Sequence, residues 1–164
     1  MKNYQLAQLN IAKMKEPLDS PLMADFVNNL DRINTLAENS EGFVWRLKDE
    51  GGDATTIRYF GDDVVVNMSV WTDVVSLSNY SFKSAHADIM RRKREWFDRM
   101  DEAYAVLWWI PTGHLPTVEE AKERLEHLKQ YGPTPHAFVF KKVFPEPDAI
   151  SSKEMNVTGA CPVE

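Results

Sequence analysis

The sequence is poor in cysteine, since Cys161 is the one cysteine among 164 residues. A single cysteine excludes an intramolecular disulfide, so we expect a reducing cytoplasm as the location of this chain. No apolar run approaches the ~18 residues that a membrane-spanning helix needs. Polar residues also interrupt the N-terminal segment between Gln5 and Lys13. We therefore expect neither a signal peptide nor a membrane partner.

Positive charge is also scarce. The chain has 19 Lys and Arg against 25 Asp and Glu, which gives a net charge of −6. Nucleic-acid binders usually carry a basic excess, so this balance argues against a nucleic-acid partner.

Several motifs that mark known chemistry are absent from the sequence. It has no GxGxxG or P-loop for a nucleotide, no HExxH or CxxC for a metal, and no Gly-x-Ser-x-Gly elbow for a serine nucleophile. The four histidines show no spacing typical of metal ligands. These absences identify no cofactor, and we expect no metal site formed by protein side chains alone.

What remains is an ordinary globular composition, with 43% hydrophobic and 27% charged residues. The length suits one domain with its own core, which we place at residues 1–144. From Pro145 the composition turns to Pro, Ser, Glu and Asn, so we expect a flexible C-terminal tail at 145–164.

The hydrophobic pattern predicts strands and helices in alternation. Period-two alternation or short apolar runs predict strands at 4–12, 43–47, 55–60, 64–71, 103–110 and 137–144. Helical spacing predicts helices at 21–38, at 76–100 with a break near Ser81, and from Thr117 to about Gly132. Thr117 and Glu120 have the spacing of a capping box.

This order is β-α-β-β-α-β, with an extra strand near residue 57 and an appended α-β unit. It predicts an α+β, ferredoxin-like fold, in which helices cover one face of an antiparallel sheet. Four tryptophans, Trp45, Trp71, Trp108 and Trp109, exceed what one helical layer covers. A second copy of the chain would cover the other face, so we expect a homodimer.

Five stretches carry a resemblance to a known family. They are NMSVW at 67–71, RKREWF at 92–97, WWIPTGH at 108–114, PTVEEA at 116–121 and GPTP at 132–135. Over residues 4–144 the sequence resembles an uncharacterised bacterial domain family of the dimeric α/β barrel superfamily. That superfamily includes the antibiotic-biosynthesis and the haem-degrading monooxygenases.

The resemblance implies a barrel made from the sheets of two protomers, with a pocket between each sheet and its helices. In monooxygenase relatives this pocket binds a flat aromatic substrate or haem. In the haem-degrading group an Asn on the first strand acts with a Trp and a His on the second long helix. Asn10 and His86 match two of these positions. Tyr80 is the nearest aromatic residue to the third, a departure that favours haem binding by His86 over haem degradation.

His86 is the main candidate for catalysis, because imidazole can move a proton or bind a metal near neutral pH. The alternative is a histidine that bonds a neighbouring backbone group. Asn10 and Gln8 interrupt a strand face that is otherwise apolar, and their amides could hold a substrate oxygen. Asn67 and Ser69 share one face of a central strand and could line the same pocket, or simply meet water.

Aromatic side chains are the other candidate ligand contacts. Trp71, Tyr80 and Trp108 could stack on a planar substrate, although such residues more often form core or interface. The run from Arg91 to Arg94 could bind a carboxylate or a haem propionate, but a solvated helix face paired with acidic neighbours is the simpler interpretation. For His114 we favour a contact that stabilises its loop.

Three functions remain open at this point. The first is a small-molecule oxygenase of the antibiotic-biosynthesis-monooxygenase type, in which His86 and Asn10 act on the substrate. The second is a haem-binding protein with His86 as axial ligand. The third is a dimeric ligand-binding module without catalysis.

Overall fold

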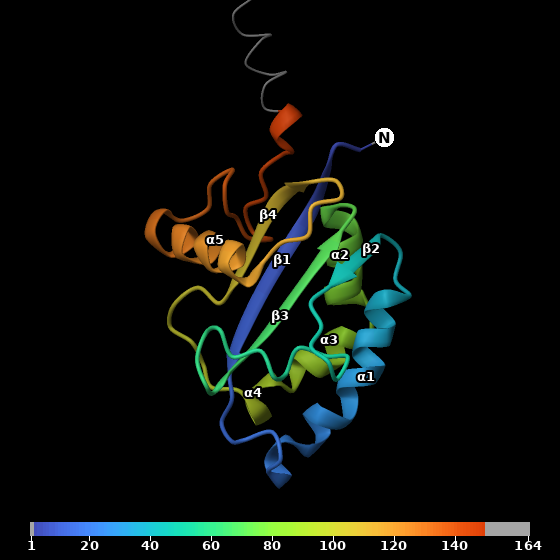
Figure 1. Ribbon diagram of the computed structural model, residues 1–164, viewed down its shortest axis with the longest axis vertical. Coiled ribbons are helices and arrows are strands. Elements are labelled where there is room, and N and C mark those ends of the chain that lie inside the picture. The colour runs from blue at the N-terminus through green and yellow to red at the C-terminus, as the bar shows by residue number, and fades with distance from the viewer. Residues whose placement is uncertain (1, 150–164) are drawn as a thin grey trace, which may run out of the picture.

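One antiparallel sheet organises the part of the chain that the computed structural model describes, residues 2–149. Its strands are β1 (Tyr4–Lys13), β2 (Phe43–Arg46), β3 (Val64–Trp71) and β4 (Ala105–Pro111). They lie in the order β2-β3-β1-β4 (Figure 1). The longest strand, β1, is central and pairs with β3 on one side and β4 on the other.

The helical elements connect these strands. They are η1 (Pro21–Met23), α1 (Ala24–Glu38), α2 (Val74–Lys83), α3 (Ala85–Arg91), α4 (Lys93–Trp96) and α5 (Val118–Tyr131). With α2–α4 as the second helical region, the order is β-α-β-β-α-β followed by α5. The α+β class, the antiparallel sheet and the ferredoxin-like order expected from the sequence are confirmed.

The sheet is covered on both faces, as Figure 1 shows with α1–α4 on one side and α5 on the other. Leu6, Trp71 and Leu107 belong to the face that packs against the α1–α4 layer. Leu9 and Trp108 belong to the opposite face, which packs against α5 and the segment 47–63. The expectation that helices cover one face alone is therefore wrong, because the chain provides its own second cover. The homodimer was inferred from that uncovered face and the dimeric barrel from the family resemblance, and both stay predictions.

Two expected strands do not form. Residues 55–60 are turns, because Asp49 and Asp53 accept hydrogen bonds from backbone N–H groups that a strand would need. Asp49 accepts from Gly51 and Thr56, and Asp53 accepts from Thr55. Short-range hydrogen bonds of this kind compete with strand pairing.

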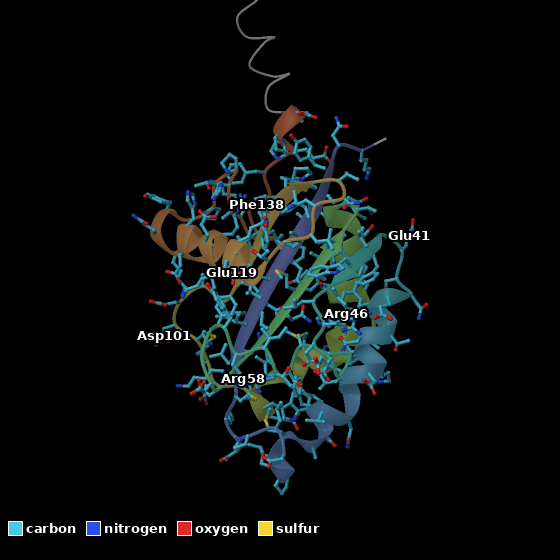
Figure 2. All side chains as sticks on the ribbon, viewed as in Figure 1. Glu41, Arg46, Arg58, Asp101, Glu119 and Phe138 are labelled. Carbon is cyan, nitrogen blue, oxygen red and sulfur yellow. The ribbon has the colours of Figure 1, made fainter. Side chains whose placement is uncertain are left out.

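Residues 137–144 do not form the expected strand either. Isolated bridges replace it, and one of them joins Phe138 to Leu107 on the outer side of β4. The backbone N–H of each residue donates to the carbonyl of the other, at 2.8 and 2.9 Å. Figure 2 labels Phe138 beside β4 and α5. The appended unit is thus α5 followed by a bridged loop.

The long second helix is divided into α2, α3 and α4. Ser84 ends α2 and begins α3, since its hydroxyl donates to the carbonyl of Tyr80 and accepts from the N–H of His86. A serine that bonds both neighbouring turns favours a helix boundary over a helix interior. The sequence predicted a break near Ser81, and the structure has it three residues later, at Ser84. His86 therefore lies in the first turn of α3.

Of the expected tail, residues 145–164, the structure describes residues 145–149, and residues 150–164 lie outside the described part. Within the described part, residues 147–149 are helical and the Asn3 amide donates to Asp148 at 2.9 Å. Among residues 2–149 no helix is both long enough and apolar enough to cross a bilayer.

Candidate functional site

A cavity lies between β1 and β3 on one side and α1, α3 and α4 on the other. Its volume is about 170 Å³ for the centres of water-sized molecules. One water needs about 10–15 Å³ by this measure, so the cavity has room for a small organic molecule. Its polar lining includes Asn10, Asn29, Asn34, Arg46, Asn67, His86, Lys93, Arg94, Asp98 and Tyr104. Apolar groups from Phe26, Leu30, Ile33, Ile89, Phe97 and Met100 complete the wall.

His86 lines this cavity from the first turn of α3. Its Nδ1 lies 3.1 Å from the backbone carbonyl oxygen of Ser81. A carbonyl can only accept, so Nδ1 carries the proton and Nε2 keeps a free lone pair. Within residues 2–149, Nε2 has no hydrogen-bond partner. Burial lowers the pKa of His86, partly opposed by the Ser81 hydrogen bond, and this favours a neutral, basic imidazole at pH 7.

Asn10 and Asn67 face each other across β1 and β3 and also line the cavity. Side chains directly opposite in an antiparallel pair have Cβ atoms about 4.5–5.5 Å apart, so the two amides are neighbours. Asn67 is exposed although β3 is an interior strand, which means that the cavity is open to solvent above it. The Asn10 amide makes no hydrogen bond to any other described residue. Of the polar candidates from the sequence, the structure thus brings His86, Asn10 and Asn67 to one cavity, whereas Gln8 does not line it.

Ser69 and Trp71, also expected to contact substrate, lie behind the cavity and do not line it. Gln8 Nε2 donates to Asn67 Oδ1 at 2.6 Å and to Ser69 Oγ at 2.8 Å. Trp71 Nε1 donates to the same Ser69 oxygen at 2.8 Å. Trp71 is fully buried and both Gln8 and Ser69 are nearly so. These side chains therefore support Asn67 from within the core.

Tyr80 connects this buried chain to His86. Its ring stacks on Trp71, with centroids 5.0 Å apart, and lies 4.8 Å from the His86 ring. Its hydroxyl donates to the Ile33 carbonyl at 3.4 Å. Burial raises the pKa of Tyr80, so the phenol stays protonated. Tyr80 positions the imidazole and is not part of the main cavity wall.

Trp108 lies on the other face of the sheet and is fully buried. Its Nε1 donates to Glu120 of α5 at 3.0 Å. Glu120 also binds His114 Nε2 at 2.7 Å, which ties the loop before α5 to that helix. Trp108 is therefore a core residue away from the cavity, and His114 has the loop-stabilising contact that the sequence favoured. Thr117 caps α5 through the Glu120 N–H, but the Glu120 carboxylate is taken by Trp108 and His114.

The basic run divides into two pairs. Arg91 and Arg92 form ion pairs on the surface, Arg91 with Asp88, and Arg92 with Asp25 and Glu95. Lys93 and Arg94 line the cavity instead, and Lys93 lies over the Tyr104 ring at 5.6 Å from its centroid. Half of the run thus matches the solvated interpretation and half faces the candidate site.

Sequence reasoning missed Arg46 and the two α1 amides, Asn29 and Asn34. Arg46 ends β2 (Figure 2). It lines the cavity, and its guanidinium donates to Glu38 at 2.8 Å. That ion pair lowers the pKa of the Glu38 carboxyl. Asn29 and Asn34 could have been found as the polar residues within one turn of Leu30 and Ile33 on the inner side of α1.

The donor set for a metal is sparse. Among residues 2–149 no group of three His, Cys, Asp or Glu side chains could hold a metal ion. If a haem were bound here, the unprotonated Nε2 of His86 would hold its iron, and Lys93 and Arg94 also line the cavity.

The fold and the site together define an α+β, ferredoxin-like protein with a polar cavity between its sheet and the α1–α4 layer. The chain belongs to the family described as Domain of unknown function (DUF3291), whose model matches residues 5–154. No match was found among curated proteins.

Two solved structures are similar to this chain. One is the NE2512 protein of unknown function from Nitrosomonas europaea, at 14% identity and a TM-score of 0.44, covering 70% of this chain and 96% of that one. The other is SnoaB, a cofactor-independent oxygenase from Streptomyces nogalater, at 14% identity and a TM-score of 0.40, covering 71% of this chain and 98% of that one.

Proposed function

We propose that this chain is a small-molecule enzyme of the oxygenase type that works without a metal or an organic cofactor. The observation that supports it best is the state of His86. Its Nδ1 is held by the Ser81 carbonyl, its Nε2 has no hydrogen-bond partner among residues 2–149, burial lowers its pKa, and the residue lines the cavity together with Asn10 and Asn67. A neutral base in the same cavity as hydrogen-bonding amides suits the removal of a proton from an acidic hydroxyl.

The proposed step uses a phenol or a quinol. His86 Nε2 takes the hydroxyl proton, and the amides of Asn10 and Asn67 orient the resulting oxyanion. The anion then reduces molecular oxygen, one oxygen atom bonds to carbon, and the other leaves as water with the two substrate hydrogens. The balance is SH₂ + O₂ → SO + H₂O, and the proton on His86 returns to the departing oxygen.

Oxygen uptake with a panel of phenols and quinols tests this proposal. We expect His86→Gln to lower kcat at least 100-fold, since general-base catalysis is worth about 10²–10⁴ in rate and glutamine cannot accept a proton. His114→Gln is the matched control, because His114 is bound to Glu120 away from the cavity. An oxygen-uptake rate in His86→Gln equal to that of the wild type would remove His86 from the mechanism.

The pH dependence provides an independent test. Because the pKa of His86 is lowered by burial, the basic form persists below the pH of ~6.5 at which histidine usually titrates. We expect kcat/KM to rise with pH to a plateau, and the midpoint of this rise to lie below pH ~6.5. The ¹H–¹⁵N NMR titration of the His86 ring should give the same midpoint in the free enzyme. A midpoint above 7 by either method would contradict the proposed base.

Haem binding is a second candidate, favoured by the free Nε2 of His86 and by Lys93 and Arg94 on the same wall. His86 would hold the iron and the two basic side chains would pair with the propionates. Bound haem would supply oxygen-activating iron. A Soret band that develops on adding haemin, disappears in His86→Ala and persists in His114→Ala would support this candidate. Spectra identical to free haemin would eliminate it.

The third function, a ligand-binding module without catalysis, predicts binding of the same small molecules with no turnover.

We also propose a homodimer, which the superfamily resemblance supports, and a cytoplasmic location, which the single cysteine supports. Because α5 and the segment 47–63 cover the second face of the sheet, the interface would use other surfaces. Sedimentation equilibrium tests the homodimer, and a measured mass near 18.9 kDa, that of one chain, would count against it.

A further inference from the structure

The orientation of the Asn67 amide is set by Gln8, a residue that does not itself line the cavity. Gln8 Nε2 has two hydrogens, and both have acceptors: Asn67 Oδ1 at 2.6 Å and Ser69 Oγ at 2.8 Å. An amide nitrogen can only donate, so the oxygen end of Asn67 is the end directed to Gln8. The nitrogen end, with its two N–H groups, is left for the cavity.

The chain behind Gln8 holds it in this role. Ser69 Oγ accepts from Gln8 and, on its other side, from the indole N–H of Trp71 at 2.8 Å. An indole nitrogen can only donate, so the direction of the Trp71–Ser69 hydrogen bond is fixed, and the second lone pair of Ser69 Oγ accepts from Gln8. Gln8 is 9% exposed, Ser69 7% and Trp71 0%. Reversing the arrangement would require both amides to turn over and the Ser69 hydroxyl to donate to Gln8 while it still accepts from Trp71.

We infer that Gln8 is a positioning residue that makes Asn67 a fixed hydrogen-bond donor, so that the site selects ligands with a carbonyl or oxyanion oxygen over β3. Asn10, opposite on β1, makes no hydrogen bond within the described residues and is free to present either end of its amide. The site thus combines one fixed donor with one adaptable amide. This inference rests on the proposed function only in its choice of cavity, and it concerns binding rather than turnover.

Substitution of Gln8 by glutamate tests the inference, because a carboxylate has the same shape but can only accept. With Gln8→Glu, Asn67 must turn its N–H groups to residue 8 and present Oδ1 to the cavity. Acetophenone, which only accepts, and indole, which only donates, serve as small neutral ligand probes. We expect the wild type to prefer acetophenone and the variant to lose that preference or reverse it, by roughly tenfold in the ratio of the two Kd values.

Gln5→Glu is the matched control, since it adds the same charge to the same strand on the opposite face of the sheet. It should leave the preference as it is in the wild type. A folded Gln8→Glu protein with the wild-type preference would overturn the inference. The inference would also be overturned if acetophenone caused no NMR shift at Asn67 of the wild type, or if the wild type bound acetophenone no more tightly than indole.

A measurement on the wild type covers the case in which Gln8→Glu does not fold. We expect the side-chain amide protons of Gln8 to be protected from exchange with water and those of Asn67 to exchange fast. The opposite pattern would overturn the inference. If the ligand preference and the exchange pattern hold while no substrate consumes oxygen, the oxygenase proposal fails and the role of Gln8 stands.

Discussion

At the scale of single residues, the candidate site depends on atoms whose hydrogen-bonding role has no alternative. The Ser81 carbonyl can only accept and the Trp71 indole can only donate. The first sets the tautomer of His86, and the second secures the acceptor role of Ser69. The tautomer of His86 is therefore fixed from outside the cavity, and Asn67 is reached from the core through Ser69 and Gln8.

Gly42, outside the site, is a residue whose replacement we expect to destabilise the fold. Its φ is +81°, and a Cβ there would lie 2.2 Å from Ser76 Oγ and 2.4 Å from Ser76 Cβ. Both the backbone strain and the clash with α2 oppose any side chain. We expect Gly42→Ala to lower the free energy of unfolding by more than about 2 kcal/mol in urea titrations.

Gly52 provides the comparison for that measurement. Its φ is +90°, but nothing lies within 4 Å of the position of a Cβ. Gly52→Ala therefore has the backbone strain without the clash, and we expect it to cost about 1 kcal/mol. Equal losses in the two variants would show that the approach of Gly42 to Ser76 has no energetic weight.

At the scale of elements, α2 begins at an N-cap that depends on pH. The Asp73 carboxylate accepts from the Ser76 N–H at 2.8 Å and pairs with Lys2 at 3.0 Å. The Ser76 hydrogen bond is the main cause that lowers the pKa of Asp73. A carboxyl with a lowered folded-state pKa stabilises the protein above its unfolded pKa of ~3.9, and this contribution is lost as the pH falls through the folded value.

We therefore expect Asp73→Asn, which keeps a capping oxygen but has no charge, to be less stable than the wild type at pH 7 by less than about 1 kcal/mol. The difference should shrink below pH ~4, as Asp73 becomes protonated. Urea titrations of both proteins at pH 7 and pH 3 check this. A difference that stays constant with pH would mean that the Asp73 charge contributes nothing.

The sequence predicts the elements whose residues point to one structure at several levels. β1, α1, β3, β4 and α5 form where hydrophobic spacing, helix starts and stops agree. The strands expected at 55–60 and 137–144 do not form, because side chains of Asp49 and Asp53 and local bridges take the backbone groups there. Hydrogen bonds of this kind depend on loop geometry, which period-two alternation does not encode.

The same limit applies to the site. Asn10, Asn67 and His86 could be selected because each is a polar residue in an otherwise inward-facing pattern, and the structure places all three at one cavity. Ser69, Trp71 and Tyr80 were also expected to contact a ligand, but they do not line this cavity and instead contact Gln8, each other and His86. Trp108 lies on the opposite face. Sequence spacing gives the face of a strand, whereas depth depends on which helices pack above it.

At the scale of the whole molecule, the loop after α5 is part of the core. Phe138 is fully buried and packs with Trp109 and Phe144, and its backbone pairs with Leu107. We expect Phe138→Ala to lower the free energy of unfolding by about 3–5 kcal/mol. Phe140→Ala, at a residue that is 36% exposed, should cost less than about 1 kcal/mol.

Circular dichroism and tryptophan fluorescence should report the same unfolding midpoint for both variants, because the loop and the sheet share one core. A Phe138→Ala protein with wild-type stability would show that the loop after α5 does not contribute to the stability of the core.

The bridge between Leu107 and Phe138 has a consequence beyond folding. A sheet exposes unpaired backbone groups at its two outermost strands, and long flat strands there recruit other chains into aggregates. Here one margin, β4, is partly occupied by Phe138, and the other, β2, has four residues and an irregular register between Phe43 and Trp45. Neither margin offers a long template, so the fold protects itself against intermolecular β-assembly.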